Sequence, residues 1–439
     1  MRFIMHIVTI SLILVSGHAL PVGIHTAPII LIAKDIRAVQ FHPLEKYRLF
    51  ITDSDGQAKL IPFQIDERDK YADFVLDKGP VPNSNFGNGI FDFNDELVFM
   101  GNDVGSTTPP TKWNIPKPNI IYQINFDNQA DKRSGAIFVG IYFGDPPPMP
   151  KISYVHFDLP KSEVLTSRYH YRFNDKNYLV VQNIDLLKNK TLNPFIDGST
   201  FYLKADLKYF LTISINQSDI ESTLEAYKAG PIRAITRVTF TYKFLRLNFN
   251  LGMYTEVSFF GNSVILPAII DNPLDAKKNL NEGSIFYYGL SLIPNPKDLT
   301  IDNNMQKYKE KAGFNFFKSD PQPDTGLYWI QAKRNEEVIL IQITPSLEMR
   351  RDGAVPMLYV EDKPGSDLKS RTKNPAPLGK SPVNVAVALD LSGLSKGTHT
   401  VAFTLFVENK ATPEMIQDLI NLNQWGVKTK RLPLVINSP

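Results

Sequence analysis

Three consecutive residues, Arg168, Tyr169 and His170, combine the side-chain types that a polysaccharide lyase needs. β-Elimination on a uronic acid requires one group that removes a proton and a cation that neutralises the neighbouring carboxylate. In a strand, Arg168 and His170 share one face, while Tyr169 lies on the other. The segment therefore has two interpretations: a catalytic site, or a strand with a polar outer face and an aromatic core face.

A second candidate site is the segment from Gly87 to Gly105, where acidic and amide side chains surround a glycine-containing turn. Aligning Gly89 with the glycine of a calcium loop puts Asn88, Asp92 and Asp95 at ligand-like positions. One of the other expected ligand positions falls on a phenylalanine, which cannot bind a metal. Calcium is one interpretation of this pattern, and a polar loop that turns the chain into the next strand is the other.

Arg233 follows Gly230 and Pro231 at the start of a run that alternates like a strand. The planar guanidinium could pair with a buried carboxylate, such as Asp66 or Glu96, or bind an acidic sugar. We favour the pair within the fold, because an arginine at the start of a strand commonly has a structural partner.

The segment Gly393 to Gly397 matches the G-x-S-x-G pattern of a nucleophile elbow. That chemistry needs a strand, a strained turn and then a helix. Because the residues after Gly397 alternate like a strand, we interpret the glycines as a hairpin connection. The sequence holds no phosphate-binding loop, no dinucleotide-binding glycine pattern and no H-E-x-x-H zinc motif.

The composition is that of a folded protein with nearly balanced charge. The chain has 439 residues, a net charge of +3 and no cysteine. Without thiols there are no disulfides, thiolate metal sites or cysteine nucleophiles. The mild charge, with no basic patch interleaved with aromatics, argues against a nucleic-acid partner.

The N-terminus has the pattern of a secretory signal. Arg2 supplies a positive charge, Ile7 to Val15 form an apolar core, and Ala19 sits at a small-residue position before a cut. We expect cleavage after Ala19 and no transmembrane span afterwards, with an uncleaved anchor as the alternative. Export without disulfides favours a bacterial protein that is secreted or periplasmic.

Alternating apolar and polar residues predict a mostly β fold. Prolines in residues 144–150 mark a domain boundary, because consecutive prolines cannot pair in the centre of a sheet. A Thr412 cap followed by Pro413 predicts a helix that ends at Gly426. We expect a signal peptide over 1–19, an N-terminal β domain over 20–145, a large antiparallel, supersandwich-like β-sandwich over 151–344, with a short helix from Leu299 to Ala312, and an immunoglobulin-like part with a terminal α-helix over 345–439.

Three of these segments together resemble a known family. The runs "IPFQIDERD", "FNDELVFMGNDVG" and "AGPIRAITRVTFTY" are similar to a family of secreted bacterial β-sandwich proteins whose motifs are not tied to a reaction. More distantly, the pattern is similar to proteins of the rhamnogalacturonan-exolyase-like kind, whose large β-sandwiches handle polysaccharide. The resemblance covers under half of the chain and implies a fold and a compartment, with no catalytic role. It rests on Gln64, Asp66, Asp95, Glu96, Asp103, Gly105, Gly230, Pro231 and Arg233.

These observations leave three functions open. The first is a non-catalytic binding protein for a carbohydrate or another cell-envelope component, with Arg233, Asp66 and Glu96 as candidate ligand-binding residues. The second is a lyase-type enzyme on acidic glycans, and the third is a structural assembly module. Calcium is the one cofactor that the sequence suggests, and the tryptophans are candidates for stacking on sugar rings or for the core: Trp113, Trp329 and Trp425.

Overall fold

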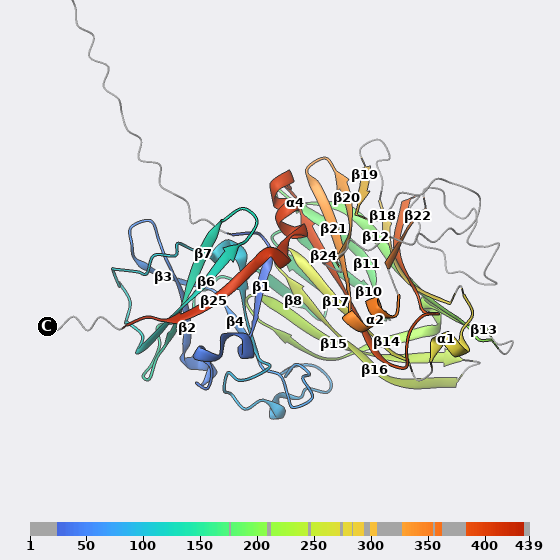
Figure 1. The fold of residues 1–439 in the computed structure, drawn as a ribbon, viewed down its shortest axis with the longest axis horizontal. Coiled ribbons are helices and arrows are strands. Elements are labelled where there is room, and N and C mark those ends of the chain that lie inside the picture. Colours follow the sequence, from blue (N-terminus) through green and yellow to red (C-terminus); the bar gives the residue numbers. More distant parts are fainter. Residues whose placement is uncertain are drawn as a thin grey trace, which may run out of the picture.

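A computed structural model describes residues 24–174, 177–208, 212–244, 247–272, 275–282, 284–293, 299–304, 327–353, 356–361 and 383–433. In this part of the chain the protein is mostly β with few helices (Figure 1), which confirms the predicted fold class. The expected signal peptide, residues 1–19, lies outside the described residues. None of the helices within the described ranges is long and apolar enough to cross a membrane.

The N-terminal module is built from two sheets that pack around one apolar core. One sheet has the order β1-β5-β4 and the other the order β25-β6-β7-β2-β3. A hairpin with its turn around Asp53 and Gly56, where the sequence has an Asp-Gly pair between alternating runs, joins β2 to β3. The strands are β1 Pro28–Ile32, β2 Tyr47–Thr52, β3 Ala58–Ile61, β4 Gln64–Asp66, β5 Glu96–Met100, β6 Ile120–Asn128, β7 Ser134–Ile141 and β25 Trp425–Arg431.

The large sandwich follows, and its strands pair almost entirely antiparallel. Two layers face each other in Figure 1, and the side chains between them form the largest apolar core. The strands are β8 Val155–Asp158, β9 Glu163–Thr166, β10 Tyr169–Asn174, β11 Asn177–Lys188, β12 Thr191–Asp206, β13 Thr212–Asn216, β14 Ile220–Ala229, β15 Arg233–Phe244, β16 Leu247–Phe260, β17 Ser263–Asn272, β18 Ile285–Leu292, β19 Leu299–Asn303, β20 Tyr328–Arg334, β21 Glu337–Pro345, β22 Pro356–Glu361, β23 Val383–Asp390 and β24 Gly397–Glu408.

The strands of the C-terminal region share their sheets with the two preceding regions. β23 pairs with β18, and β24 pairs with β17 and β21. After α4 the chain leaves the sandwich, and β25 pairs with β6 as an edge strand of the N-terminal module (Figure 1). The region 345–439, predicted as an immunoglobulin-like part, therefore ties the sandwich to the module.

The described helices are short: α1 Ala276–Asn279, α2 Leu347–Arg351 and α4 Pro413–Ile420. α4 confirms the predicted terminal helix, with the Thr412 hydroxyl accepting the backbone N–H of Met415 at 3.3 Å. It ends before Gly426, because β25 begins at Trp425. The helix predicted from Leu299 is wrong for its first residues, which form β19 and pair with β20, while residues 305–312 lie outside the described ranges.

Both faces of the first half of β15, from Arg233 to Val238, are buried. Ala234 and Val238 point into the sandwich core. On the other face, Arg233 and Arg237 are buried together with Ile235. The N-terminal module supplies the cover, so this face of β15 is the joint between the two parts.

Candidate functional site

The structure does not bring the three candidate catalytic side chains together. Tyr169 is fully buried, and its hydroxyl donates to the backbone carbonyl of Phe260 at 2.8 Å. Burial raises the pKa of Tyr169 well above its ordinary value, so the phenol stays protonated. His170 lies on the outer face of β10, as the alternation predicted, and Arg168 lies just before the strand; neither reaches the buried tyrosine hydroxyl.

Arg168 and His170 each contact a carboxylate on another strand, Glu408 of β24 and Glu163 of β9. His170 Nε2 lies 2.8 Å from Glu163 Oε2 of β9. Arg168 Nη1 donates to Asn409 Oδ1 at 2.9 Å and lies 3.3 Å from the buried carboxylate of Glu408. The histidine–glutamate contact could move a proton, whereas Arg168 already neutralises a carboxylate of the fold.

Arg233 lies at the centre of a buried ionic cluster at the joint. Its Nε donates to Asp66 Oδ2 and its Nη2 to Glu96 Oε2, each at 2.7 Å. Lys228 adds a second cation to Asp66 at 2.8 Å, and Arg68 adds one to Glu96 at 2.5 Å. The two carboxylates thus hold three cations, and the sequence-based preference for a structural pair fits this geometry. Arg233 and Asp66 are each 1 % exposed, which leaves no room for a ligand between them.

Burial and charge oppose each other at Asp66. Burial alone would raise the pKa of Asp66, but the charges of Arg233 and Lys228 outweigh it and hold the pKa below its ordinary value. The carboxylate therefore stays ionised inside the joint and keeps its charge-assisted hydrogen bonds.

Gln64 and Gly230 lock the same joint through the backbone. Gln64 Nε2 donates to both oxygens of Asp66, at 2.8 and 2.9 Å. Gln64 Oε1 accepts the backbone N–H groups of Ile232 at 3.2 Å and Arg233 at 3.1 Å. A Cβ atom on Gly230 would lie 2.0 Å from Gln64 Oε1, so a side chain there would break this arrangement.

A second polar contact holds the loop between β4 and β5 against β15 and β16. Arg237 Nη2 donates to Glu256 Oε1 at 2.7 Å and to the backbone carbonyl of Phe74 at 2.8 Å. The hydroxyl of Tyr254 donates to the carboxylate of Asp73. The N-terminal loop is thus fixed to the sandwich at two separate places.

The acidic residues of the candidate calcium loop accept hydrogen bonds from the loop itself. Asp95 accepts the backbone N–H groups of Arg68 at 2.8 Å and Asp92 at 2.9 Å. Asn88 Nδ2 donates to Asp92 Oδ2 at 2.9 Å, and Asn88 Oδ1 accepts the N–H of Ile90 at 2.8 Å. This is how a turn uses such side chains.

Burial raises the pKa of Asp95 to about 6, with the nearby charges of Asp92 and Glu67 adding to the shift. Within the described ranges, no group of three or more His, Asp or Glu side chains is arranged to hold a metal. Calcium at Asn88, Asp92 and Asp95 stays a prediction, and the hydrogen bonds of the loop favour the turn.

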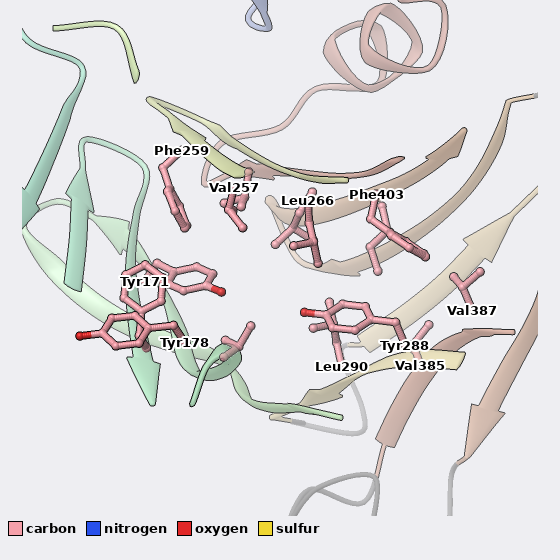
Figure 2. Close-up of a pocket in the computed structure, with 15 residues that line it drawn as sticks. Tyr171, Tyr178, Val257, Phe259, Leu266, Tyr288, Leu290, Val385, Val387 and Phe403 are labelled. Atoms are coloured by element: carbon pink, nitrogen blue, oxygen red, sulfur yellow. The ribbon is translucent and has the colours of Figure 1, made fainter. Parts of the chain in front are cut away.

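The sandwich encloses an apolar cavity of about 40 Å³ (Figure 2). Leu266 and Phe403 point across the gap between the layers toward Tyr288 and Leu290. Pockets for small-molecule ligands measure about 300–1,000 Å³, so this cavity is too small for a sugar. It is an imperfection of core packing that could hold a few water-sized molecules.

A polar groove of about 340 Å³ opens at the end of the sandwich, between the turn that joins β11 to β12 and the turn that joins β20 to β21. Asn193 Nδ2 donates to Glu337 Oε1 at 2.9 Å, and Arg334 Nη2 lies 2.9 Å from Glu337 Oε2. The guanidinium of Arg334 also stacks over the ring of Phe195, 4.7 Å from its centroid. The groove is lined by Lys188, Asn193, Pro194, Arg334, Asn335 and Glu337.

One side of the groove lies on β11 and β12, and β11 is the neighbour of β10, which carries Tyr169 and His170. His170 is the register partner of Asp185 on β11, and Asp185 is the partner of Pro194 on β12. The N–H of Leu187, next to Lys188, donates to the carbonyl of Arg168 at 2.7 Å. Sequence reasoning found one side of this surface and missed the groove, because its lining comes from two turns that are far apart in the chain.

The tryptophans pack within the fold. Trp113 lies against Phe50, with ring centroids 5.5 Å apart, and Trp425 lies 5.7 Å from His25. Trp329 packs against the apolar cluster under α4. Ser395, the residue at the centre of the G-x-S-x-G pattern, donates its hydroxyl to Asp352 at 2.6 Å, and β24 begins two residues later. A strand follows the motif, as expected, but the connection is not the expected hairpin, because β23 pairs with β18 and β22 whereas β24 pairs with β17 and β21.

Comparisons with known proteins give a limited result. No family model and no curated protein matches the chain. An alpha-mannosidase from Enterococcus faecalis V583 aligns with a TM-score of 0.45 and 9% identity, over 93% of this chain and 45% of that one. A glycosyl hydrolase family 38 protein from Enterococcus faecalis aligns with a TM-score of 0.42 and 9% identity, over 93% of this chain and 46% of that one. The chain spans less than half the length of either structure, and alignments this weak carry no inference about function.

Proposed function

We propose that this is an exported, non-catalytic protein that binds a glycan of the cell envelope, and that the glycan enters the groove between the β11–β12 and β20–β21 turns. Export follows from the signal-like N-terminus, and the resemblance to secreted β-sandwich proteins agrees with it. The groove is the observation that carries the proposal.

The chemistry of the groove suits a sugar. Its volume of about 340 Å³ lies at the lower end of the range for ligand pockets. The ammonium group of Lys188 and the amide oxygen of Asn193 offer a donor and an acceptor that sugar hydroxyls can use, while the carboxylate of Glu337 holds Asn193 and Arg334 in place. Pro194 adds an apolar edge of the kind that contacts the face of a sugar ring.

The same side chains argue against catalysis at the groove. Arg334 and Lys188 are each paired with a glutamate, Glu337 at 2.9 Å and Glu336 at 3.2 Å. No described side chain of the lining is a cysteine, serine or histidine that could act as a nucleophile or shuttle a proton at neutral pH. Binding is therefore the simpler use of the surface.

A lyase remains a second candidate, because His170 and Glu163 form a contact of 2.8 Å on the neighbouring strands. Such a pair could remove a proton from a uronic acid bound along β10. The buried Tyr169 cannot serve as its acid, so this candidate needs a proton donor other than the one that the sequence suggested.

A glycan array followed by calorimetry on the best ligand tests the proposal. Lys188→Ala should weaken binding about tenfold, equivalent to about 1.4 kcal/mol. Lys161→Ala is the matched control, since Lys161 forms a comparable surface ion pair with Asp158 at 2.7 Å outside the groove. Equal affinities of the two variants would remove the groove from the account.

The two candidates separate in one further assay. A lyase leaves an unsaturated uronate that absorbs ultraviolet light, and His170→Ala would abolish that signal. The binding proposal predicts no such product from acidic polysaccharides with the wild-type protein. Product formation that depends on His170 would replace binding by catalysis.

A further inference from the structure

The loops of the N-terminal module expose aromatic side chains that the proposed function does not use. Phe41, Phe86 and Phe93 are 60 %, 60 % and 61 % exposed, Tyr71 is 73 % exposed and Ile90 39 %. These five residues, the aromatic apex, belong to the blue and light-blue loops below β4 in Figure 1. In the part of the chain that the structure describes, Phe143 is the one further aromatic residue exposed to this degree.

The backbone holds two of these rings outward against its own preference. Phe41 has a φ of 68° and Phe93 a φ of 23°, conformations that bulky residues rarely adopt. Their rings meet edge to face, with centroids 5.7 Å apart. The N–H of Phe41 donates to Phe91 O and the carbonyl of Phe93 accepts from Lys34 N, both at 2.9 Å. Backbone hydrogen bonds thus hold an exposed phenyl pair in place at a conformational cost.

Hydrogen bonds between the loops make this surface preformed. Glu67 Oε1 accepts the N–H groups of Asn88 at 2.8 Å and Gly89 at 2.6 Å. Asp69 likewise accepts from the N–H of Tyr71 at 2.8 Å. The acidic side chains are therefore turned toward the loop backbone, and the apolar side chains face solvent.

The exposed charges around the phenyl pair are mixed. Lys34, Asp35 and Arg37 lie on the 3-10 helix Ala33–Val39, which precedes Phe41, and Glu45 lies on the 3-10 helix Leu44–Lys46, which follows it. Beside Tyr71, the ammonium group of Lys70 lies 4.9 Å from the centre of the ring. Long basic side chains next to protruding rings reach lipid phosphates when the rings enter the acyl region.

We propose that the aromatic apex docks the protein on the surface of a lipid bilayer. A ring can stack on the face of a sugar, but the sugar hydroxyls also need polar partners, and the acidic side chains beside these rings are turned toward the loop backbone. Single side chains at separate loop tips enter lipid independently, whereas the core of a protein interface is a contiguous patch. The basic residues then contact the phosphates, as the charge of a bilayer surface requires. This site is separate from the groove, so the proposal of membrane docking does not depend on the proposal of glycan binding.

Sedimentation with vesicles tests the proposal on the mature chain. Vesicles of phosphatidylcholine with about one third phosphatidylglycerol serve as the probe. The double variant Phe41→Asn and Phe93→Asn removes both rings, and asparagine tolerates positive φ better than phenylalanine, so the fold should be kept. We expect at least a tenfold loss of vesicle binding, with a melting temperature no lower than that of the wild type.

Phe143→Asn is the matched control, because it removes an exposed ring of the same module at a different place and should leave vesicle binding unchanged. Absence of vesicle binding by the wild-type protein would overturn the proposal, as would equal binding by the double variant. A wild-type dimer in sedimentation velocity that the double variant dissolves, without vesicle binding, would assign the apex to a second copy of this chain instead.

Discussion

Replacing Arg233 by methionine tests whether the buried ionic cluster holds the N-terminal module to the sandwich. The substitution keeps much of the side-chain volume and removes the charge. Asp66 and Glu96 would each lose one hydrogen bond of 2.7 Å, while Lys228 and Arg68 would still supply one cation to each. The substitution therefore removes one hydrogen bond from each carboxylate, and each carboxylate keeps one cation.

The structure sets the size of the effect. A hydrogen bond to a charged group contributes about 1.5–3 kcal/mol, and breaking a buried ion pair from one side costs about 3–5 kcal/mol. Because each carboxylate keeps its second cation, we expect the low end of this range. Arg233→Met should lower the free energy of unfolding by about 3 kcal/mol.

Urea unfolding followed by circular dichroism measures this loss. Arg172→Met is the matched control, because the Arg172 side chain is 44% exposed in its ion pair with Asp185 at 3.3 Å, and the buried Asp185 keeps a hydrogen bond from Asn183 at 2.8 Å. Exposed pairs contribute about 0–1 kcal/mol. If the two variants lose stability equally, the cluster does not hold the joint and the reasoning fails.

Three further substitutions probe the joint and the chain ends. Gly230→Ala should cost about 1–3 kcal/mol, because the new Cβ meets Gln64 Oε1 at 2.0 Å, whereas Gly198→Ala, with open space around it, should cost nothing in the same urea titration. Burial lowers the pKa of His25 to about 4 from 6.5, so the folded state binds the proton more weakly than the unfolded state. The neutral His25 thus contributes its full stability above pH 6.5, and this contribution is lost as the pH falls to 4. His25→Gln has no such group, so its free energy of unfolding relative to wild type should rise by about 3 kcal/mol as the pH falls from 6.5 to 4. Equal changes of the free energy of unfolding with pH in the two proteins would contradict this. Thr412→Ala should remove the cap of α4 and lower stability by about 1 kcal/mol, measured by thermal melting, and an unchanged midpoint would show that the cap contributes nothing.

Local patterns carried most of the fold prediction. The β2–β3 hairpin follows from an Asp-Gly turn between alternating runs, and α4 follows from a Thr-Pro start before an apolar stripe. These signals depend on residues close together in sequence. The helix predicted at Leu299 failed because the residues pair with β20, and a pairing partner about thirty positions away leaves no local trace.

The sequence predicted the part of the candidate site that depends on one side chain, the ion pairs of Arg233. A strand-start arginine with two upstream acids was enough to favour the Arg233 pair, because a buried guanidinium needs carboxylates. The groove was not predictable, since Lys188 and Glu337 come from hairpin turns that only the tertiary fold brings together. Exposure is a tertiary property as well: no pattern distinguishes the solvent-facing Phe93 from the buried Phe91.

Several of the motif residues singled out in the sequence belong to the joint between the two parts. Gln64, Asp66, Glu96 and Arg233 form the ionic cluster and its backbone lock, and Asp103 accepts the hydroxyl of Tyr154 at 2.7 Å. These contacts fix the N-terminal module to the sandwich, and none of these residues belongs to the groove or to the aromatic apex. Substitutions in the joint should change stability without changing ligand preference, and substitutions in the groove should do the reverse.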